Sequence, residues 1–303
     1  MGKRFTVTGK NDCPIAAIKK VPRKPKAIVQ IFHGMGEHKE RYIPFMDFLY
    51  ENGYGSYIHD HRKHGESLNE ADELGIFTHY DLWQDVLDDC YFISRRILKE
   101  HPGVPIIIMG HSMGSIIARG YITRYRTVAK KAIFMGTLPP YGFFKAIIPL
   151  TLSRIIGLFK GNKPSPFLAE KLNQPLLKNL EKADSKFAWI SSDEKVVKAY
   201  EEDILCGFPY NPRFYQEFFK AIIDVNKSNT IALTKDIPLL FISGQDDPVG
   251  EFGEGVDALV KLYKGHGMTQ TNTLIIEDAR HEVLNETNKD VSYQAILRWL
   301  NDA

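Results

Sequence analysis

The sequence predicts an α/β fold in which a mainly parallel central sheet is flanked by helices and carries an inserted helical cap. Short apolar runs alternate with stretches of helical periodicity through most of the 303 residues, which is typical of a parallel sheet covered on both faces. This alternation lapses between residues 138 and 230, where the sequence is rich in Pro, Phe and Lys. We therefore expect a core of residues 1–137 and 231–303, with residues 138–230 as the cap.

The expected strands follow one another along the chain. Residues 5–7 and 14–21 flank a Gly-Lys-Asn-Asp turn and predict an opening hairpin. Residues 27–32 form a continuous apolar run, which predicts a central strand. Further short runs predict strands at residues 55–58, 104–109, 132–135, 238–243 and 272–276.

Helices are expected between these strands. Residues 41–51 show helical spacing and are followed by Asn-Gly, a stop signal. Thr78, with Asp81 three residues later, resembles the start of a second helix, whose apolar positions recur until Pro102. The same spacing predicts helices at residues 113–124 and 290–300.

Composition excludes several classes of protein. With 39 basic and 37 acidic residues the formal net charge is +2, so no global field favours nucleic acid, and no protein partner is implied. The cysteines Cys13, Cys90 and Cys206 are odd in number and widely spaced, which favours a reducing compartment and a cytoplasmic location. Neither a signal peptide nor an apolar run of about 18 residues, as a membrane span requires, is evident.

The sequence Gly-His-Ser-Met-Gly at residues 110–114 matches the G-x-S-x-G pattern between an expected strand and an expected helix. A nucleophilic serine in this setting occupies a strained turn that lifts its hydroxyl above the sheet, and the glycines avoid collisions there. Ser112 is therefore the candidate nucleophile. The alternative is a plain glycine-rich turn that closes a strand.

A serine hydroxyl needs an imidazole to accept its proton and a carboxylate to orient that imidazole. When the serine sits in such a turn, the acid and then the histidine follow it, each just beyond a late strand. His281 follows the last expected strand, and Asp246 and Asp247 follow the one before it. We expect His281 to be the base rather than an ordinary surface histidine.

The developing oxyanion needs two preorganised donors. One is the backbone N–H of the residue after the nucleophile, here Met113. The other is expected from the turn after the central strand, at residues 33–38, where we assign the backbone N–H of Met35. A plain tight turn is the alternative interpretation of that segment.

A metal site is the competing chemistry for the segment after the strand expected at residues 55–58. His59, Asp60, His61 and His64 cluster after a strand and have side chains that can bind metals. Their spacing is loose and no second set of ligands accompanies them, so a polar loop with local hydrogen bonds is preferred. We expect neither a metal nor an organic cofactor, because water and the three side chains suffice for the reaction.

These motifs resemble those of the monoacylglycerol lipase and lysophospholipase group of α/β-hydrolases, which are serine hydrolases. Residues 33–38 with Arg41 and Tyr42 are similar to the family's HGxGEHxxRY, and residues 110–114 to its GHSMG. Residues 244–249 and His281 fall on its acid and histidine motifs. The resemblance covers nearly the whole core and implies an α/β-hydrolase fold.

The resemblance also decides between the two carboxylates and exposes one departure. Asp247 lies three residues after Gly244, the family's usual offset, so we assign the acid to Asp247 and leave Asp246 as a turn or solvated carboxylate. Residues 60–67 are similar to the family's DHxGHGxS loop, except that Lys63 replaces a usual glycine. That substitution puts the path of the loop in question.

The first part of the cap is apolar with basic residues interspersed. Residues 143–159 could line an acyl-chain channel, rest on a membrane surface, or simply pack against the core. A channel is compatible with either of the other two roles. The residues assigned to substrate binding in this lid are Phe143, Phe144, Ile147, Ile148 and Ile155.

The resemblance implies hydrolysis of a carboxylic ester of lipid type, a monoacylglycerol or lysophospholipid, through an acyl-enzyme on Ser112. A general carboxylesterase, a thioesterase or an aminopeptidase-like hydrolase is the first alternative. A catalytically silent binding protein on the same fold is the non-enzyme alternative, because fold alone never proves activity.

Overall fold

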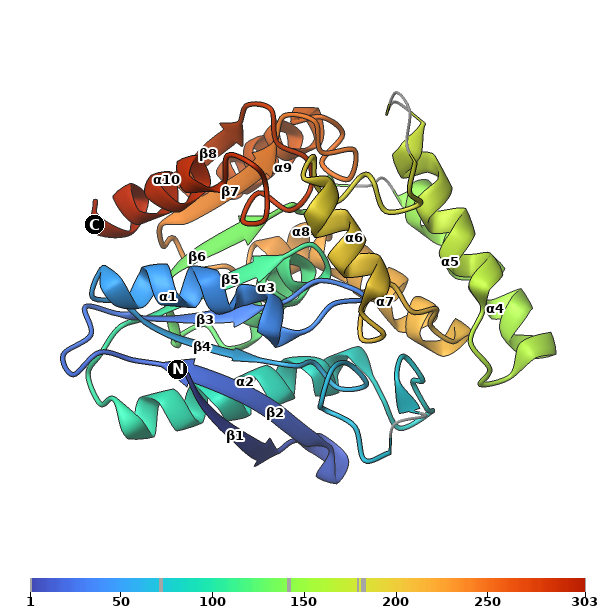
Figure 1. Ribbon diagram of the computed structural model, residues 1–303, viewed down its shortest axis with the longest axis horizontal. Coiled ribbons are helices and arrows are strands. Elements are labelled where there is room, and N and C mark those ends of the chain that lie inside the picture. The colour runs from blue at the N-terminus through green and yellow to red at the C-terminus, as the bar shows by residue number, and fades with distance from the viewer. Residues whose placement is uncertain (1, 71–72, 141–142, 179, 181–183, 303) are drawn as a thin grey trace.

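One mainly parallel sheet forms the centre of the molecule (Figure 1). The computed structural model describes residues 2–302 apart from 71–72, 141–142, 179 and 181–183, and leaves the side chains of 143–145 undescribed. Within these residues eight strands have the order β1-β2-β4-β3-β5-β6-β7-β8. They are β1 (Lys3–Thr8), β2 (Pro14–Lys20), β3 (Ile28–Phe32), β4 (Gly55–His59), β5 (Ile106–His111), β6 (Ala129–Met135), β7 (Leu239–Gly244) and β8 (Thr271–Ile276).

Strand direction follows the expectation from sequence. β1 pairs antiparallel with β2 as the opening hairpin, and β2 pairs antiparallel with β4. All pairs from β4 across to β8 are parallel. The carboxyl ends of six strands therefore share one edge of the sheet, which is where loops of α/β proteins carry functional groups.

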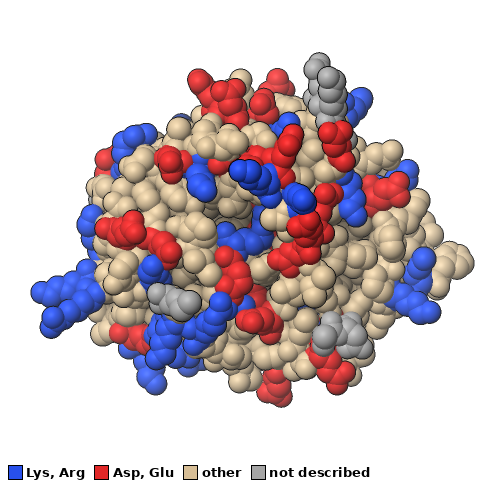
Figure 2. All heavy atoms as spheres, in the orientation of Figure 1, with Lys and Arg blue, Asp and Glu red and all other residues tan. Residues whose placement is uncertain are grey.

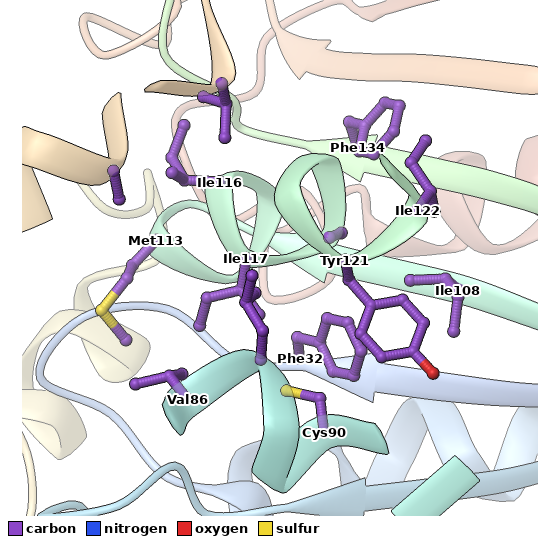
Figure 3. Close-up of a cluster of buried hydrophobic side chains, with 14 of the residues drawn as sticks. Phe32, Val86, Cys90, Ile108, Met113, Ile116, Ile117, Tyr121, Ile122 and Phe134 are labelled. Atoms are coloured by element: carbon purple, nitrogen blue, oxygen red, sulfur yellow. The ribbon is translucent and has the colours of Figure 1, made fainter. Parts of the chain in front are cut away.

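Helices cover both faces of the sheet because side chains alternate along each buried strand. In β3, Ile28 and Phe32 join the larger apolar cluster, whereas Val29 and Ile31 join the other. Figure 3 shows the larger cluster, where Ile117 and Tyr121 lie over Phe32. The helices on that face are α2 (Trp83–Glu100), α3 (Met113–Arg124) and α9 (Glu254–Gly265), and those on the other are α1 (Ile43–Glu51) and α10 (Lys289–Asn301).

The helix start predicted at Thr78 is wrong, since α2 begins at Trp83. The backbone N–H and the hydroxyl of Thr78 do donate to Asp81, at 2.8 and 2.9 Å, but Asp81 also pairs with buried Arg62 at 2.9 Å. The helix instead starts where Asp85 accepts from the N–H of Leu82 at 3.1 Å. Asp81 therefore has the spacing of a capping residue, but it binds Arg62 instead of starting a helix.

Three smaller differences have local causes. β6 starts at Ala129, three residues early, because Lys131 is accommodated inside by the carbonyl oxygens of Trp299 and Leu300, at 3.3 and 3.0 Å. The first helix begins at Ile43 rather than 41, because Lys39–Tyr42 forms a 3-10 turn. Helix α9 was not expected.

The described residues between β6 and β7 form helices and turns and no strand. The helices are α4 (Phe143–Lys160), α5 (Pro166–Asn173), η4 (Gln174–Leu177), α6 (Glu194–Glu202), α7 (Pro212–Val225) and α8 (Ser228–Ile231). α4 and α5 lie at the outer end of the molecule in Figure 1. Leu150 of α4, Leu168 of α5 and Phe214 of α7 all belong to the large core cluster. No helix in the described ranges is long and apolar enough to cross a membrane.

Candidate active site

Ser112 occupies a strained turn between β5 and α3. Its φ of 54° and ψ of −119° lie in a region that side-chain-bearing residues rarely adopt. A Cβ on Gly110 would lie 2.1 Å from the carbonyl oxygen of Gly114, and a Cβ on Gly114 would lie 2.0 Å from that of Phe32. Both positions therefore require glycine, for the steric reason expected from sequence.

The loops after β7 and β8 bring His281 and Asp247 together. His281 Nδ1 lies 3.0 Å from Asp247 Oδ1, and both side chains are buried. Asp247 also accepts from the N–H of Val249 at 2.9 Å and from Ser243 Oγ at 3.1 Å. Asp246, the alternative carboxylate, is exposed. The geometry thus places Asp247, and not Asp246, against the imidazole.

The Asp247 carboxyl is held ionised by its surroundings. Burial acts to raise the pKa of this carboxyl, but His281 and the donors Val249 and Ser243 outweigh burial, so the pKa lies below its ordinary value. An ionised Asp247 accepts a hydrogen bond from Nδ1–H, which holds the imidazole in the tautomer whose Nε2 lone pair is available. Nε2 is buried and has no hydrogen-bond partner among the described residues, so it does not bond to Ser112 either.

The turn that follows β3 lies beside Ser112. A Cβ on Gly34 would be 3.2 Å from the Ser112 Cβ, so this turn directly borders the nucleophile. Gly36 has a φ of 64°, and its N–H donates to Tyr210 Oη at 2.6 Å. The expected oxyanion donors are the N–H of Met35, which belongs to this turn, and the N–H of Met113, which is the first residue of α3 and follows Ser112.

A buried glutamate ties this turn to the nucleophile's neighbour. Glu37 accepts from the N–H of Gly34 at 2.5 Å, from Tyr42 Oη at 2.9 Å and from Arg41 at 2.9 Å, and lies 3.0 Å from His111 Nδ1. Burial opposes its ionisation, but His111, Arg41 and Gly34 lower the pKa of Glu37 to about 2. Despite its own burial, His111 has a raised pKa because Glu37 faces it.

The histidine cluster after β4 is buried, and its contacts reach His33 and Tyr210. His33 Nε2 accepts from the N–H of His61 at 2.9 Å, and His64 Nε2 lies 2.7 Å from Tyr210 Oη. Burial lowers the pKa of His59 to about 3, which keeps it neutral. Ligand atoms of His59, His61 and Cys90 lie within 4.8 Å of one another, and those of His38, Asp203 and Cys206 do likewise, so these groups have donors a metal could use.

Lys63, expected from the sequence resemblance to replace a glycine, takes a left-handed backbone conformation that glycine adopts easily. Its φ of 62° lies in the left-handed region, and its N–H donates to the Ser67 carbonyl oxygen at 3.1 Å. Its ammonium group pairs with Glu73 at 2.8 Å. The loop therefore keeps a glycine-type turn at the expense of backbone strain in a lysine.

One residue beside the imidazole was missed from the sequence. The ring of Trp189, which precedes α6, lies 5.0 Å from that of His281 between centroids. Arg280 and Glu282, on either side of His281, bind the backbone around Trp189. Nothing in the local sequence of residues 184–192 signals this contact, because it depends on how the insertion folds back over the last loop.

The predicted lid residues of α4 do not share one environment. Ile147 packs against the large core cluster, whereas Ile148 is 68% exposed and Ile155 50% exposed. Phe143 and Phe144 lie outside the described side chains. Farther along α4, Leu158 and Phe159 are also exposed. In Figure 2 the side of the molecule over α4 and α5 is mostly uncharged, with a few charged groups of both signs.

Known proteins resemble the chain over most of its length. The monoglyceride lipase homolog of Monkeypox virus is 38% identical over 268 residues, covering 88% of this chain and 85% of that protein. Human monoglyceride lipase is 26% identical, covering 91% and 83%. The crystal structure of a thermostable carboxyl esterase from Bacillus coagulans superposes with a TM-score of 0.90 and 27% identity, covering 99% of this chain and 98% of that one.

The family follows from a separate match. Residues 23–288 fit the family described as serine aminopeptidase, S33, and this range holds β3 through β8 together with Ser112, Asp247 and His281. The chain is therefore a member of the serine aminopeptidase S33 family, and its fold is that of the α/β-hydrolases.

Proposed function

We propose that this protein is a serine hydrolase that cleaves carboxylic esters of lipids, with monoacylglycerols or lysophospholipids as substrates. One observation carries the chemistry: a serine in a strained strand-to-helix turn lies at the same edge of the sheet as a buried histidine–aspartate pair. The Nε2 of that histidine has no hydrogen-bond partner among the described residues. The substrate class is supported by relatives that are themselves monoglyceride lipases.

In the proposed mechanism Ser112 Oγ attacks the ester carbonyl while His281 Nε2 takes its proton. Asp247, 3.0 Å from Nδ1, fixes the tautomer and stabilises the imidazolium. The N–H groups of Met35 and Met113 stabilise the oxyanion. His281 then passes the proton to the alcohol oxygen as the carbon–oxygen bond breaks, which leaves an acyl group on Ser112.

Deacylation repeats these steps with water. His281 accepts a proton from water, the hydroxide attacks the acyl carbon, and the proton returns to Ser112 Oγ as the fatty acid leaves. No step requires an oxidant, a reductant or an external cation. The buried ionic group around Glu37 supports the reaction indirectly, because it holds the oxyanion turn against the segment that carries Ser112.

We further propose that residues 138–230 act as the cap and that α4 meets the lipid phase. Ile148, Leu158 and Phe159 are exposed on α4, and Lys160 ends the helix. An apolar face with basic residues beside it is the pattern of interfacial helices. The acyl chain would then enter beneath α4, past Ile147. A cytoplasmic location is supported by Cys13, Cys90 and Cys206, all of them free and buried.

Two other reaction classes remain candidates on the same machinery. The family description names a serine aminopeptidase, so an amide substrate is the second candidate, and a general carboxylesterase or thioesterase is the third. A silent binding protein is disfavoured by the buried His281–Asp247 pair. A substrate's free α-amino group would need a carboxylate at the mouth of the site. Glu37 and Glu282 are instead engaged with Arg41, at 2.9 and 2.6 Å.

The deciding experiment compares substrates on the purified protein. We expect labelling of Ser112 by a fluorophosphonate and hydrolysis of octanoylglycerol far faster than that of an aminoacyl anilide. Labelling without hydrolysis of any ester would contradict the proposed function. If the fluorophosphonate labels neither the parent nor Ser112→Ala, the result would instead support the silent binding protein.

A further inference from the structure

Two neighbouring rings at the site each have a buried nitrogen atom without a hydrogen-bond partner among the described residues. His281 Nε2 and Trp189 Nε1 are both buried, and neither has a hydrogen-bond partner among the described residues. The rings are 5.0 Å apart between centroids and inclined at 50°. The proposed mechanism accounts for Nε2. It leaves the indole N–H unexplained. A buried donor without an acceptor costs free energy unless a ligand supplies the acceptor.

The segment that carries Trp189 is anchored, so the indole is held in place. Arg280 donates to the carbonyl oxygen of Ala188 at 2.7 Å. The N–H of Glu282 donates to the carbonyl oxygen of Ile190, also at 2.7 Å. The residues before and after Trp189 are therefore bound by the residues before and after His281. A donor fixed in this way is preorganised for a ligand.

In the proposed mechanism the leaving alcohol lies on the same side of the site as the Trp189 indole. His281 Nε2 must give its proton to the departing alcohol oxygen, so the alcohol portion of the ester lies against the imidazole. Trp189 borders the same imidazole. We propose that Trp189 Nε1 is a hydroxyl-binding subsite, which donates a hydrogen bond to a second hydroxyl oxygen of the leaving alcohol. The site then prefers esters of polyols such as glycerol to esters of simple alcohols. This proposal rests on the proposed ester hydrolysis.

The test holds the acyl group constant and varies the alcohol. The specificity constant, kcat/KM, is measured for 1-octanoylglycerol and for ethyl octanoate with the parent, Trp189→Phe and Trp189→His. Phenylalanine keeps a ring against His281 but removes the N–H, whereas histidine keeps a ring donor. The matched control is Trp83→Phe, because Trp83 Nε1 is also buried without a partner but stands at the start of α2, against Phe218.

We expect Trp189→Phe to lower kcat/KM for octanoylglycerol by about 3- to 10-fold, the range for loss of one neutral hydrogen bond. Its kcat/KM for ethyl octanoate should stay within about twofold. The preference should be partly retained in Trp189→His and unchanged in Trp83→Phe. Equal losses on both esters, or an unchanged ratio, would overturn the subsite while leaving the ester hydrolase intact. A parent that cleaves neither ester would overturn the proposed function itself.

Discussion

The active site buries polar side chains, whereas helix α4 exposes apolar ones. At the site, Asp247, Glu37 and His281 are buried, and both carboxylates have several donors. On α4, Ile148 and Phe159 are exposed, at 68% and 86%. Buried polar groups must be paired within the protein, so the fold itself determines their positions. Exposed apolar groups have no such constraint within the fold, and they are typical of surfaces that bind a partner or a lipid phase.

The largest expected effect tests the buried side of this comparison. Ser112→Ala should lower ester turnover by on the order of 10⁵- to 10⁶-fold. Stability should hold or improve, because the φ of 54° is no easier for serine than for alanine and the core keeps its packing. Ser292→Ala is the control, since it removes another serine hydroxyl, one that is buried and has no hydrogen-bond partner among the described residues. Similar turnover in Ser112→Ala and the parent would remove the nucleophile assignment.

The second prediction separates the two neighbouring carboxylates. Asp247→Asn should reduce kcat by on the order of 10⁴-fold, because an amide at 3.0 Å from Nδ1 favours the wrong imidazole tautomer. Asp246→Asn should change kcat by less than about threefold, because this side chain is exposed. Steady-state kinetics on one soluble ester suffices. A crippled Asp246→Asn would transfer the acid role to the other residue.

How far the sequence could predict the molecule differs between the same two regions. The glycines around Ser112 are needed because any Cβ there meets backbone at about 2 Å, so the local pattern alone contains the reason for the turn. The pairing of His281 with Asp247 could be expected because parallel strands end at one edge. The contact of Trp189 with His281 could not, because it depends on how residues 184–192 pack over a loop almost a hundred residues away.

The apolar pattern of α4 was harder to interpret for a related reason. Apolar residues at helical spacing predict a helix, but the pattern is the same whether the face meets core, substrate or lipid. Ile147 packs inward while its neighbour Ile148 points out, and the sequence treats them alike. The false helix start at Thr78 has the same origin, since nothing local shows that Asp81 pairs with Arg62.

The third prediction concerns stability against pH. The pKa of Glu37 is about 2 in the fold and 4.5 ordinarily, so its carboxylate stabilises the fold fully above about pH 4.5 and progressively less as the pH falls towards 2. Glu37→Gln should therefore lower the melting temperature at pH 6 and flatten its decline between pH 5 and 2.5. The exposed Glu277→Gln is the control. Parallel curves for Glu37→Gln and the parent would mean that the ion group adds no pH-dependent stability.

The opposite slope is expected from the partner of Glu37. His111 has a raised pKa, so its charge stabilises the fold fully below about pH 6.5 and less as the pH rises through the folded value. The parent should therefore also lose stability on the alkaline side. Glu37→Gln should lose that dependence as well, because the carboxylate 3.0 Å from Nδ1 is its cause. Thermal unfolding from pH 6 to 9 measures this limb.

The fourth prediction tests the exposed side of the comparison. The double change Ile148→Ser and Ile155→Ser should alter the free energy of unfolding by less than about 1 kcal/mol, because both side chains are half or more exposed. It should reduce hydrolysis of a long-chain monoacylglycerol in vesicles severalfold and leave a dissolved butyryl ester unaffected. Ile147→Ser is the contrast, since it packs on the core and should lose stability and both activities. Unchanged vesicle activity in the double variant would exclude lipid contact through these residues.

The smallest effect is expected at Lys63, a lysine in a left-handed turn of the loop after β4. Lys63→Gly and Lys63→Ala both remove the ion pair with Glu73, a partly buried pair that contributes up to about 1 kcal/mol. They differ in backbone strain, because alanine at a φ of 62° keeps a penalty of about 1 kcal/mol that glycine avoids. Lys63→Gly should therefore be the more stable of the two, with both close to the parent in turnover. Urea unfolding resolves a difference of this size. Equal stabilities would mean that the loop relaxes around the Cβ and that the left-handed turn stores no strain.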